Sequence, residues 1–304
     1  MKHFLAISNH STVELTELLQ LSAELKTLYK SGSRDVCLEG KTLAMLFEKP
    51  SLRTRLSFAV AMTDLGGHTI YLKPEDLGGS LGQREPIKDM ARVLSRMLDG
   101  IMVRTFDHNA VVELAQYASV PVINALTDHC HPCQAMADVL TIREHFGNLE
   151  SIKIAFIGDG NNVARSLAFA CAKFKIKMSI ASPRGYELDG DSIAAANHIA
   201  PDSIKQINDP LQAVKDAQII YTDTWVSMGQ ENEKKKRIKA FKGFQINSEL
   251  LKASPKDAKI MHCLPAYRDY EITDECMESP NSIVFDQAEN RLHFQRALLK
   301  KLMS

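Results

Sequence analysis

The sequence predicts an α/β protein of two domains, each a parallel β-sheet covered by helices. The chain has 304 residues, which is enough for about two domains of ordinary size. Its composition, with 45% hydrophobic and 24% charged residues, is typical of a folded globular protein. Short apolar runs alternate with amphipathic stretches almost from end to end, which is the pattern of parallel strands connected by helices.

The first domain is expected to span residues 1–147. Its apolar and β-branched runs predict strands at 41–47, 68–72, 100–105 and 121–125. The amphipathic stretches around them predict helices at 12–29, 55–65, 87–98, 109–118 and 133–146. The domain boundary follows His145-Phe146-Gly147-Asn148, where a helix closes before a new strand.

The second domain is expected to span residues 148–285. We expect strands at 152–157, 177–181, 218–222, 259–263 and 282–285. Helices are expected at 162–173, 191–199, 210–216 and 248–253, and a last helix at 286–302. One charged run, Glu231 to Lys239, carries five Lys and Arg residues and is expected to form a solvated loop or helix face.

Charge and hydropathy exclude several classes of protein. The 37 Lys and Arg balance the 37 Asp and Glu, so no overall basic field attracts nucleic acid or an anionic membrane surface. No apolar run approaches the roughly 18 residues of a membrane span. The first residues meet His10 and Glu14 too soon for a secretory signal. The six cysteines have no framework spacing, so we expect reduced thiols in a cytoplasmic protein.

Ligands of parallel α/β sheets lie beyond the carboxyl ends of the strands. The first strand runs into Ser51-Leu52-Arg53-Thr54-Arg55, where Ser51 and Thr54 suit a helix N-cap. A helix N-terminus and two guanidinium groups match phosphate oxygens, so this segment is a candidate phosphate site built without glycines. The alternative is an ordinary capped helix whose arginines form structural ion pairs.

The third and fourth strands also end in polar side chains. Arg104 stands at the tip of a buried strand, where structural pairing is the alternative to a ligand contact. Cys130 and Cys133 have the spacing of a redox pair or of half a zinc site, but no second such pair exists. We favour the interpretation that His131 and Gln134 face the same cavity as Arg53 and Arg104.

Three strand ends of the second domain carry further candidates. The turn Gly158-Asp159-Gly160-Asn161-Asn162 lacks the third glycine of a dinucleotide site, so it is interpreted as aiming Asn162 at a small ligand. Asp223 opens a segment that ends at Gly229 before the charged run, a pattern that suggests a mobile lid. His262-Cys263-Leu264-Pro265 places a thiol beside an X-Pro bond that is a candidate for the cis form.

Together these motifs resemble those of the ornithine carbamoyltransferases, within the aspartate/ornithine carbamoyltransferase family. The Ser-Thr-Arg-Thr-Arg loop of that family appears at 51–55, with Leu52 in place of the usual threonine. His-Pro-x-Gln appears at 131–134, and Asp-Gly-x-Asn appears around Asn162. Asp-x-Trp-x-Ser-Met-Gly, His-Cys-Leu-Pro and Glu-Asn-Arg follow at 223–229, 262–265 and 289–291. Ser80 departs from the family, because relatives often carry there a glutamine that assists the phosphate.

The resemblance implies a role for each matched residue. Carbamoyl phosphate would be bound by Ser51, Leu52, Arg53, Thr54, Arg104, His131, Gln134, Cys263, Leu264 and Arg291. Ornithine would be bound by Asn162, Asp223, Ser227 and Met228. Arg104, His131, Cys263 and Arg291 would be the catalytic residues. The C-terminal helix, 286–304, would cross back to the first domain.

The activity implied is transfer of the carbamoyl group of carbamoyl phosphate to the δ-amine of L-ornithine, giving L-citrulline and phosphate. The resemblance implies no cofactor, no metal and a homotrimer. A carbamoyltransferase that acts on another amine, such as putrescine or lysine, is the nearest alternative. A non-catalytic or redox protein that uses Cys130 and Cys133 is the remote one.

Overall fold

The computed structural model describes all residues from 1 to 304, and the chain divides into two compact units. Unit 1 consists of Met1–Leu140 and Glu289–Ser304, and unit 2 consists of Thr141–Ala288. Two helices, α6 (Pro132–Phe146) and α13 (Val284–Met303), contain the points at which the chain passes from one unit to the other. The predicted fold class, two parallel sheets covered by helices, is confirmed.

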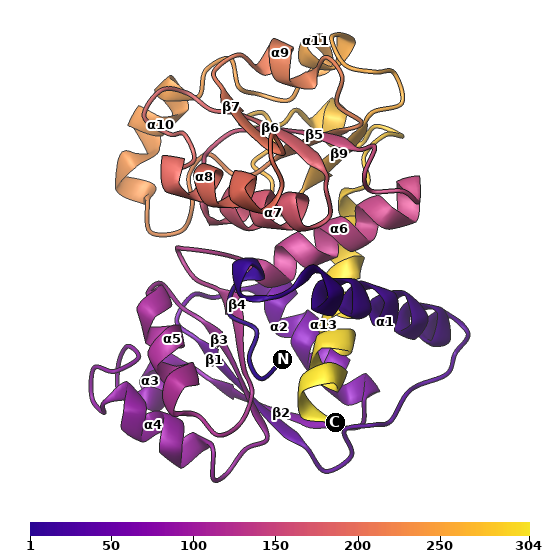
Figure 1. Ribbon diagram of the computed structural model, residues 1–304. Helices are drawn as coiled ribbons and strands as arrows, with labels where there is room; N and C mark the ends of the chain where they lie inside the picture. Colours follow the sequence, from indigo (N-terminus) through magenta and orange to yellow (C-terminus); the bar gives the residue numbers. More distant parts are fainter. The chain divides into compact units, whose positions relative to one another are not determined.

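Unit 1 contains a four-stranded parallel sheet in the order β2-β1-β3-β4. Its strands are β1 (Thr42–Phe47), β2 (His68–Leu72), β3 (Gly100–Arg104) and β4 (Val122–Leu126). The other helices of the unit are α1 (Thr12–Lys30), α2 (Leu52–Asp64), α3 (Pro74–Leu77), α4 (Ile87–Leu94) and α5 (His108–Tyr117), after a 3-10 turn at Ile7–Asn9. Helices α4 and α5 lie on one side of the sheet, and α1, α2 and α13 lie on the other (Figure 1).

Unit 2 contains a five-stranded parallel sheet in the order β7-β6-β5-β8-β9. Its strands are β5 (Lys153–Ile157), β6 (Lys177–Ala181), β7 (Ile204–Ile207), β8 (Ile219–Thr222) and β9 (Lys259–His262). Helices α7 (Asn162–Lys173) and α8 (Gly190–Ile199) pack together beside β6 and β7. The remaining helices are α9 (Pro210–Val214), α10 (Lys234–Ala240), α11 (Ser248–Lys252) and α12 (Asp274–Met277), with a 3-10 turn at Glu231–Glu233 before α10.

One strand predicted from the sequence was wrong, and one strand was missed. The run at 282–285 forms only an isolated bridge from Ser282 to Ile260, and α13 begins at Val284. A short apolar run at the start of a helix has the same local pattern as a buried strand. Conversely, β7 was not predicted, because Lys205 and Gln206 interrupt its apolar residues, as is usual for a strand at the edge of a sheet.

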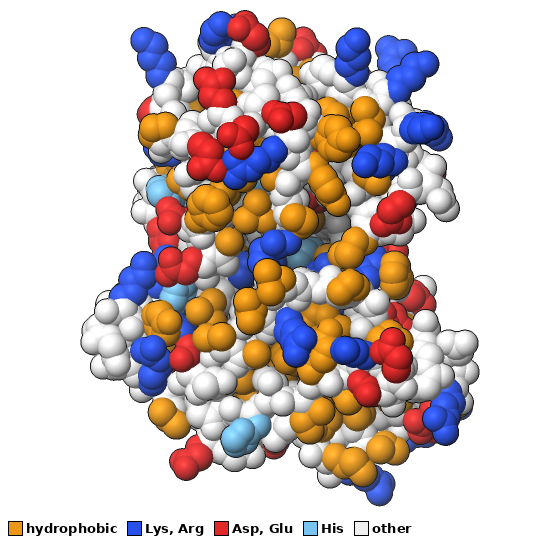
Figure 2. Space-filling view, turned by 180° about the vertical axis from the view of Figure 1, so that it is seen from behind, with side chains coloured by type: hydrophobic (Ala, Val, Ile, Leu, Met, Phe, Trp, Pro, Cys, Tyr) orange, Lys and Arg blue, Asp and Glu red, His pale blue; other side chains and the backbone are white.

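The surface agrees with the balanced charge of the sequence. Acidic and basic side chains are interspersed on the face drawn in Figure 2, without a large field of one sign. None of the helices combines the length and the apolar character that crossing a membrane requires.

Candidate active site

The candidate residues of unit 1 follow strands that are neighbours in the sheet. The chain runs from β1 outward to β2 in one direction and from β3 outward to β4 in the other, so the order of the sheet reverses between β1 and β3. The loops after β1, β3 and β4 begin side by side. The backbone N–H of Glu48 donates to the Arg104 carbonyl at 2.9 Å, and that of Thr105 donates to the Leu126 carbonyl at 3.0 Å. Such a reversal is where open α/β sheets bind their ligands.

The segment after β1 begins a helix earlier than the sequence indicated. Ser51 is the N-cap of α2, and its hydroxyl accepts a hydrogen bond from the Thr54 N–H at 3.3 Å. Arg53 and Thr54 therefore lie in the first turn, where the helix dipole is positive and favours an anion. The Leu52 side chain is 69% exposed, so only its backbone is available to a ligand in this turn.

Arg291 of α13 joins the first turns of two other helices. One of its terminal nitrogens donates to Gln134 Oε1 at 2.6 Å, and the other donates to Thr54 Oγ1 at 3.1 Å. Gln134 Nε2 in turn donates to Asp138 Oδ1 at 2.8 Å, which fixes the orientation of the amide. The structure thus brings Arg291 of α13 to residues of α6 and α2 that lie 157 and 237 positions earlier in the sequence.

His131 lies in the same group of buried side chains. Its pKa is well below the ordinary value, first because the ring is buried and then because of the positive charges of Arg291 and Arg104. At neutral pH the imidazole is therefore uncharged and has one N–H to donate. Two guanidinium groups and a neutral imidazole form an arrangement that suits an anionic ligand and stabilises negative charge developing on it.

Sequence reasoning missed Lys49, the second residue after β1. Its side chain is buried, forms an ion pair with Asp128 and lies 4.0 Å from the centre of the Phe106 ring. The preceding residue, Glu48, accepts hydrogen bonds from the Leu81 N–H and from the Thr105 hydroxyl. These two residues connect the loops after β1, β3 and β4 with the 78–86 segment. Lys49 could have been found from the sequence, because a lysine close to the end of a buried strand needs a specific partner.

In unit 2 the order of the sheet reverses between β5 and β8. Asn161 follows β5, caps α7 by accepting from the Val163 and Ala164 N–H groups, and donates to Asp223 Oδ2 at 2.7 Å. Gly160 permits this turn, because a Cβ there would lie 2.1 Å from the Leu188 nitrogen. Asn161 thus supports Asp223 directly, a contact that the sequence did not predict. Asn162 is half-buried at the first position of α7.

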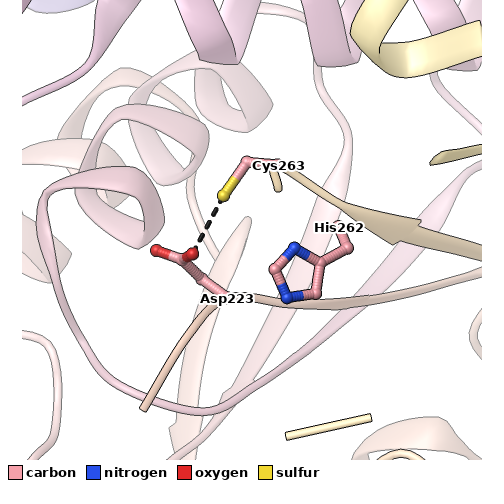
Figure 3. A group of neighbouring side chains, drawn as sticks. All are labelled: Asp223, His262 and Cys263. Carbon is pink, nitrogen blue, oxygen red and sulfur yellow. Dashed lines mark hydrogen bonds between the residues drawn. The ribbon is translucent and has the colours of Figure 1, made fainter. Parts of the chain in front are cut away.

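Three donors converge on the buried carboxylate of Asp223. Besides Asn161, the Thr224 N–H donates to Oδ1 at 2.7 Å and the Cys263 thiol donates to the same oxygen at 2.9 Å (Figure 3). Cys263 follows β9, the neighbour of β8 in the sheet, so the contact joins two adjacent strand ends. An acid and a thiol at this edge can contact the charged or nucleophilic nitrogen of an amine.

The segment after Asp223 is a compact turn. The Ser227 N–H donates to Gln230 Oε1 at 3.1 Å, and the Gly229 N–H donates to the Glu231 carboxylate at 3.1 Å. Gly229 has a φ of 91°, a conformation that favours glycine. The Met228 side chain is 45% exposed, whereas Trp225 is buried.

Asp223, His262 and Cys263 lie close enough together to be a candidate metal site, but the contacts of His262 do not favour one. One potential ligand atom from each residue lies within 4.8 Å of the others. However, His262 Nδ1 accepts from the Leu264 N–H at 2.8 Å, and Nε2 pairs with Glu271 at 3.1 Å. Both ring nitrogens are therefore engaged in holding the Leu264 turn. Leu264 has a φ of 58° and precedes a cis peptide bond to Pro265.

The contacts of Cys130 and Cys133 do not favour redox chemistry. Both thiols are buried and neither is in a disulfide, and burial raises the pKa of Cys133 to about 12. A thiol that stays protonated is a poor nucleophile. Cys130 lies in a polar network, in which it accepts from Asn124 Nδ2 at 3.2 Å and donates to the Leu5 carbonyl at 3.4 Å.

Comparison with known proteins gives matches over both units. Residues 2–144 match the family model described as the carbamoyl-P binding domain of aspartate/ornithine carbamoyltransferase, and residues 150–302 match its Asp/Orn binding domain. A curated ornithine carbamoyltransferase of Archaeoglobus fulgidus is 50% identical over 303 residues, covering 100% of this chain and 98% of that protein. One from Thermococcus kodakarensis is 51% identical over 302 residues, covering 98% and 95%. The solved structure of ornithine carbamoyltransferase from Pyrococcus furiosus has a TM-score of 0.96 at 49% identity, covering 99% of this chain and 97% of that one.

Proposed function

The chain belongs to the aspartate/ornithine carbamoyltransferase family, and from this premise we propose how its residues transfer the carbamoyl group of carbamoyl phosphate to the δ-amine of L-ornithine. The products are L-citrulline and phosphate. Carbamoyl phosphate binds to the domain of residues 1–147 with the helix 286–304, and ornithine binds to residues 148–285. The observation that carries this assignment is the gathering of Arg104, His131 and Arg291 with Thr54 and Gln134.

The phosphate group is held at the first turn of α2. Ser51, the Leu52 backbone, Arg53 and Thr54 bind its oxygens, helped by the positive end of the helix dipole. The planar guanidinium of Arg53 offers two parallel donors to a phosphate. The bond from Arg291 to Thr54 supports a shared role, because it keeps a second guanidinium beside this turn.

The carbonyl oxygen of the carbamoyl group is polarised by Arg104, His131 and Arg291. As the amine attacks the carbonyl carbon, a C–N bond forms and negative charge develops on that oxygen. The C–O bond to phosphate then breaks, and the proton lost by the amine nitrogen goes to the departing phosphate. Fixed donors and positive charges stabilise the developing oxyanion without reorganising. The neutral state of His131 supports its role as a hydrogen-bond donor. Gln134, Cys263 and the Leu264 backbone contact the carbamoyl nitrogen.

The acceptor is held by Asn162, Asp223, Ser227 and the Met228 backbone, which grip its α-ammonium and α-carboxylate groups. Asp223 supports a cationic acceptor, because it places a buried carboxylate at the switch point of the second sheet. Cys263 lies beside the side-chain amine. That amine must be deprotonated to attack, since an alkylammonium has a pKa of about 10.4.

The proposal also covers the oligomeric state of the protein, its location in the cell and its metabolic pathway. An apolar stripe of Leu52, Leu56 and Val60 is exposed on α2, and Ile70 is exposed on β2. Such a surface supports association with further copies of the chain, and we propose a homotrimer. The six cysteines are reduced thiols, which supports a cytoplasmic location. The product L-citrulline places the reaction in arginine metabolism.

A colorimetric citrulline assay with carbamoyl phosphate and a panel of amines tests the function. We expect ornithine to be carbamoylated with a kcat/KM at least about tenfold above those of lysine and putrescine, a ratio that corresponds to about 1.4 kcal/mol. Putrescine has no α-carboxylate for Asn162 and Met228 to bind. Better turnover of putrescine or lysine than of ornithine would overturn the choice of acceptor.

A further inference from the structure

We propose that Arg237 is a positioning residue of the acceptor site, which holds the segment after β8 against the turn after β5. This inference rests on the proposed assignment of Asp223, Ser227 and Met228 to ornithine. Arg237 touches none of the reacting atoms in this proposal. It acts through the two segments that carry Asp223 and its partner Asn161.

The burial of Arg237 first sets it apart from its neighbours. It belongs to α10, whose lysines Lys234, Lys235, Lys236 and Lys239 are exposed, as the charge run predicts. Arg237 alone among these cations is buried, with 6% of its surface exposed. A buried cation requires specific partners, because removing it from water is costly.

The partners of Arg237 come from four segments. One terminal nitrogen donates both to Asp159 Oδ2 and to the Trp225 carbonyl, each at 2.9 Å. Its Nε donates to Glu233 Oε2 at 3.3 Å, one turn earlier along the chain. The guanidinium carbon lies 4.9 Å from the centre of the Tyr186 ring. A single side chain therefore joins the turn after β5, the segment after β8 and helix α10.

These contacts flank Asp223 in the sequence and in space. Asp159 stands two residues before Asn161, whose amide donates to Asp223 Oδ2 at 2.7 Å. Trp225 stands two residues after Asp223 and leads directly to Ser227 and Met228. The carboxylate of Asp223 is thus fixed between two segments that Arg237 holds together.

An aromatic cluster also packs against the segment after β8, through Trp225. The Trp225 ring stacks on Phe241 with 5.7 Å between ring centres, and Phe241 contacts Tyr186 at 4.9 Å. Phe241 is fully buried. This packing retains Trp225 when the guanidinium is removed, so loss of Arg237 is expected to alter the course of the backbone around 223–228 rather than to unfold the domain.

The charge of Arg237 also affects the protonation of the Asp159 carboxyl. Burial raises the pKa of the Asp159 carboxyl, and the adjacent Arg237 charge opposes that rise. Arg237→Met leaves this carboxyl buried without its cation, so it must be protonated or move. Asp159→Asn in the same chain removes the unbalanced charge. Comparing the single and double variants therefore separates the effect of the unbalanced charge from the loss of the hydrogen bonds that the guanidinium donates.

Steady-state kinetics on the full chain tests the proposal. We expect Arg237→Met to raise KM for ornithine about tenfold or more, with KM for carbamoyl phosphate within about twofold of the unmutated value. Arg237→Lys should raise KM for ornithine less, because a lysine can pair with Asp159 but has no second nitrogen for Glu233 and no planar group to lie over the Tyr186 ring. Lys239→Met, which removes an exposed cation from the same helix, is the matched control and should change neither constant.

A purely structural role predicts another pattern. In that case Arg237→Met lowers the melting temperature and the amount of active protein, while KM for ornithine stays at the unmutated value, and the proposal is wrong. If Arg237→Met does not fold, the same comparison is made with Arg237→Lys. An unchanged KM for ornithine in that variant contradicts the proposal, and a raised KM supports it.

The proposed function is tested separately by Asp223→Asn and by citrulline formation in the unmutated protein. If both behave as the function requires and Arg237→Met leaves KM for ornithine unchanged, only the inference on Arg237 fails. If the unmutated protein forms no citrulline from ornithine, the function and the inference fail together.

Discussion

Arg53 and Arg55 have the same side chain and stand two residues apart, yet the fold gives them different surroundings. Arg55 is exposed and lies over the Tyr71 ring at 4.1 Å, which leaves it outside the group around Arg291. Arg53 is half-buried in the first turn of α2, beside the Thr54 residue that Arg291 contacts. Of the two arginines in the phosphate motif, we therefore assign only Arg53 to the phosphate.

This difference predicts opposite results for the same substitution. Arg53→Lys should weaken the affinity for carbamoyl phosphate by about tenfold or more, since an ammonium cannot reproduce a two-pronged guanidinium contact. Arg55→Lys is the matched control and should leave the affinity within about twofold, because its stacking partner is Tyr71. Isothermal titration calorimetry with carbamoyl phosphate measures both. Equal effects of the two substitutions on the affinity would contradict the assignment of the phosphate to Arg53 alone.

Cys130→Ser provides a second test at the level of the residue. A serine hydroxyl can accept from Asn124 and donate to the Leu5 carbonyl, which are the contacts of the thiol. We expect kcat for citrulline formation to stay within about threefold of the unmutated value, since neither contact involves a substrate. A loss of activity in Cys130→Ser, or one equivalent of zinc bound to the unmutated protein, would revive the metal or redox interpretation.

Helix α13 is the element that places Arg291, and it is held on several sides. Lys26 Nζ of α1 donates to Asn290 Oδ1 at 2.8 Å, and Arg296 pairs with Asp64 of α2. Phe294 packs against Phe4 with 5.7 Å between ring centres. His293 bonds to Glu289 at 2.9 Å and accepts from Arg296 at 3.2 Å. The second contact requires an unprotonated nitrogen on His293.

His293 gives the stability of this element a defined pH dependence. Burial, the largest cause, lowers the pKa of His293 from 6.5 to about 4. Below pH 6.5 the unfolded chain binds a proton at this histidine that the folded chain does not bind until about pH 4. The free energy of unfolding must therefore fall as the pH drops through this window. His131, whose pKa is also lowered, acts in the same direction.

We expect His293→Gln to reduce the fall of the melting temperature between pH 6.5 and about 4, because glutamine keeps a donor and an acceptor but does not titrate. His198→Gln, at an exposed site on α8, is the control and should leave the pH dependence unchanged. Thermal denaturation followed by circular dichroism measures both variants. An unaltered pH dependence in His293→Gln would assign the effect to other groups.

The same elements show what the sequence can and cannot predict. Eight of the nine strands follow from apolar runs, because a strand buried in a parallel sheet needs little but such residues. The location of Ser51 at the start of a helix follows from its capping chemistry. Arg237 could not be found in this way, since nothing in a run of lysines marks the one cation that becomes buried. Its burial depends on Asp159, which is 78 residues away.

At the scale of the whole molecule, the exposed apolar residues of α2 indicate a surface that binds another protein chain. Leu52, Leu56 and Val60 are spaced at one turn each along the helix, with 69%, 53% and 39% of their surface exposed. The opposite side of α2 buries Phe58 and Met62 in unit 1. The helix is thus apolar on two sides, of which this chain covers only one.

We predict that the protein has a mass of about 102 kDa in solution, three times the 33.9 kDa of one chain. Leu56→Glu should lower this mass, because it places a charge within the apolar stripe. Multi-angle light scattering after size exclusion measures both, with Lys239→Met as a surface control. A monomeric unmutated protein at micromolar concentration would contradict the homotrimer.

The central claim is that each domain binds one substrate, and the most direct test is the pair of KM values measured in two variants. Asp223→Asn removes a charge-assisted contact of roughly 1.5–3 kcal/mol, so kcat/KM for ornithine should fall by about one to two powers of ten. We expect Arg53→Lys to raise KM for carbamoyl phosphate and to leave KM for ornithine within about threefold, and Asp223→Asn to do the reverse. If both variants change the KM of the same substrate, or if Asp223→Asn changes neither, the assignment of the two substrates to separate domains is wrong.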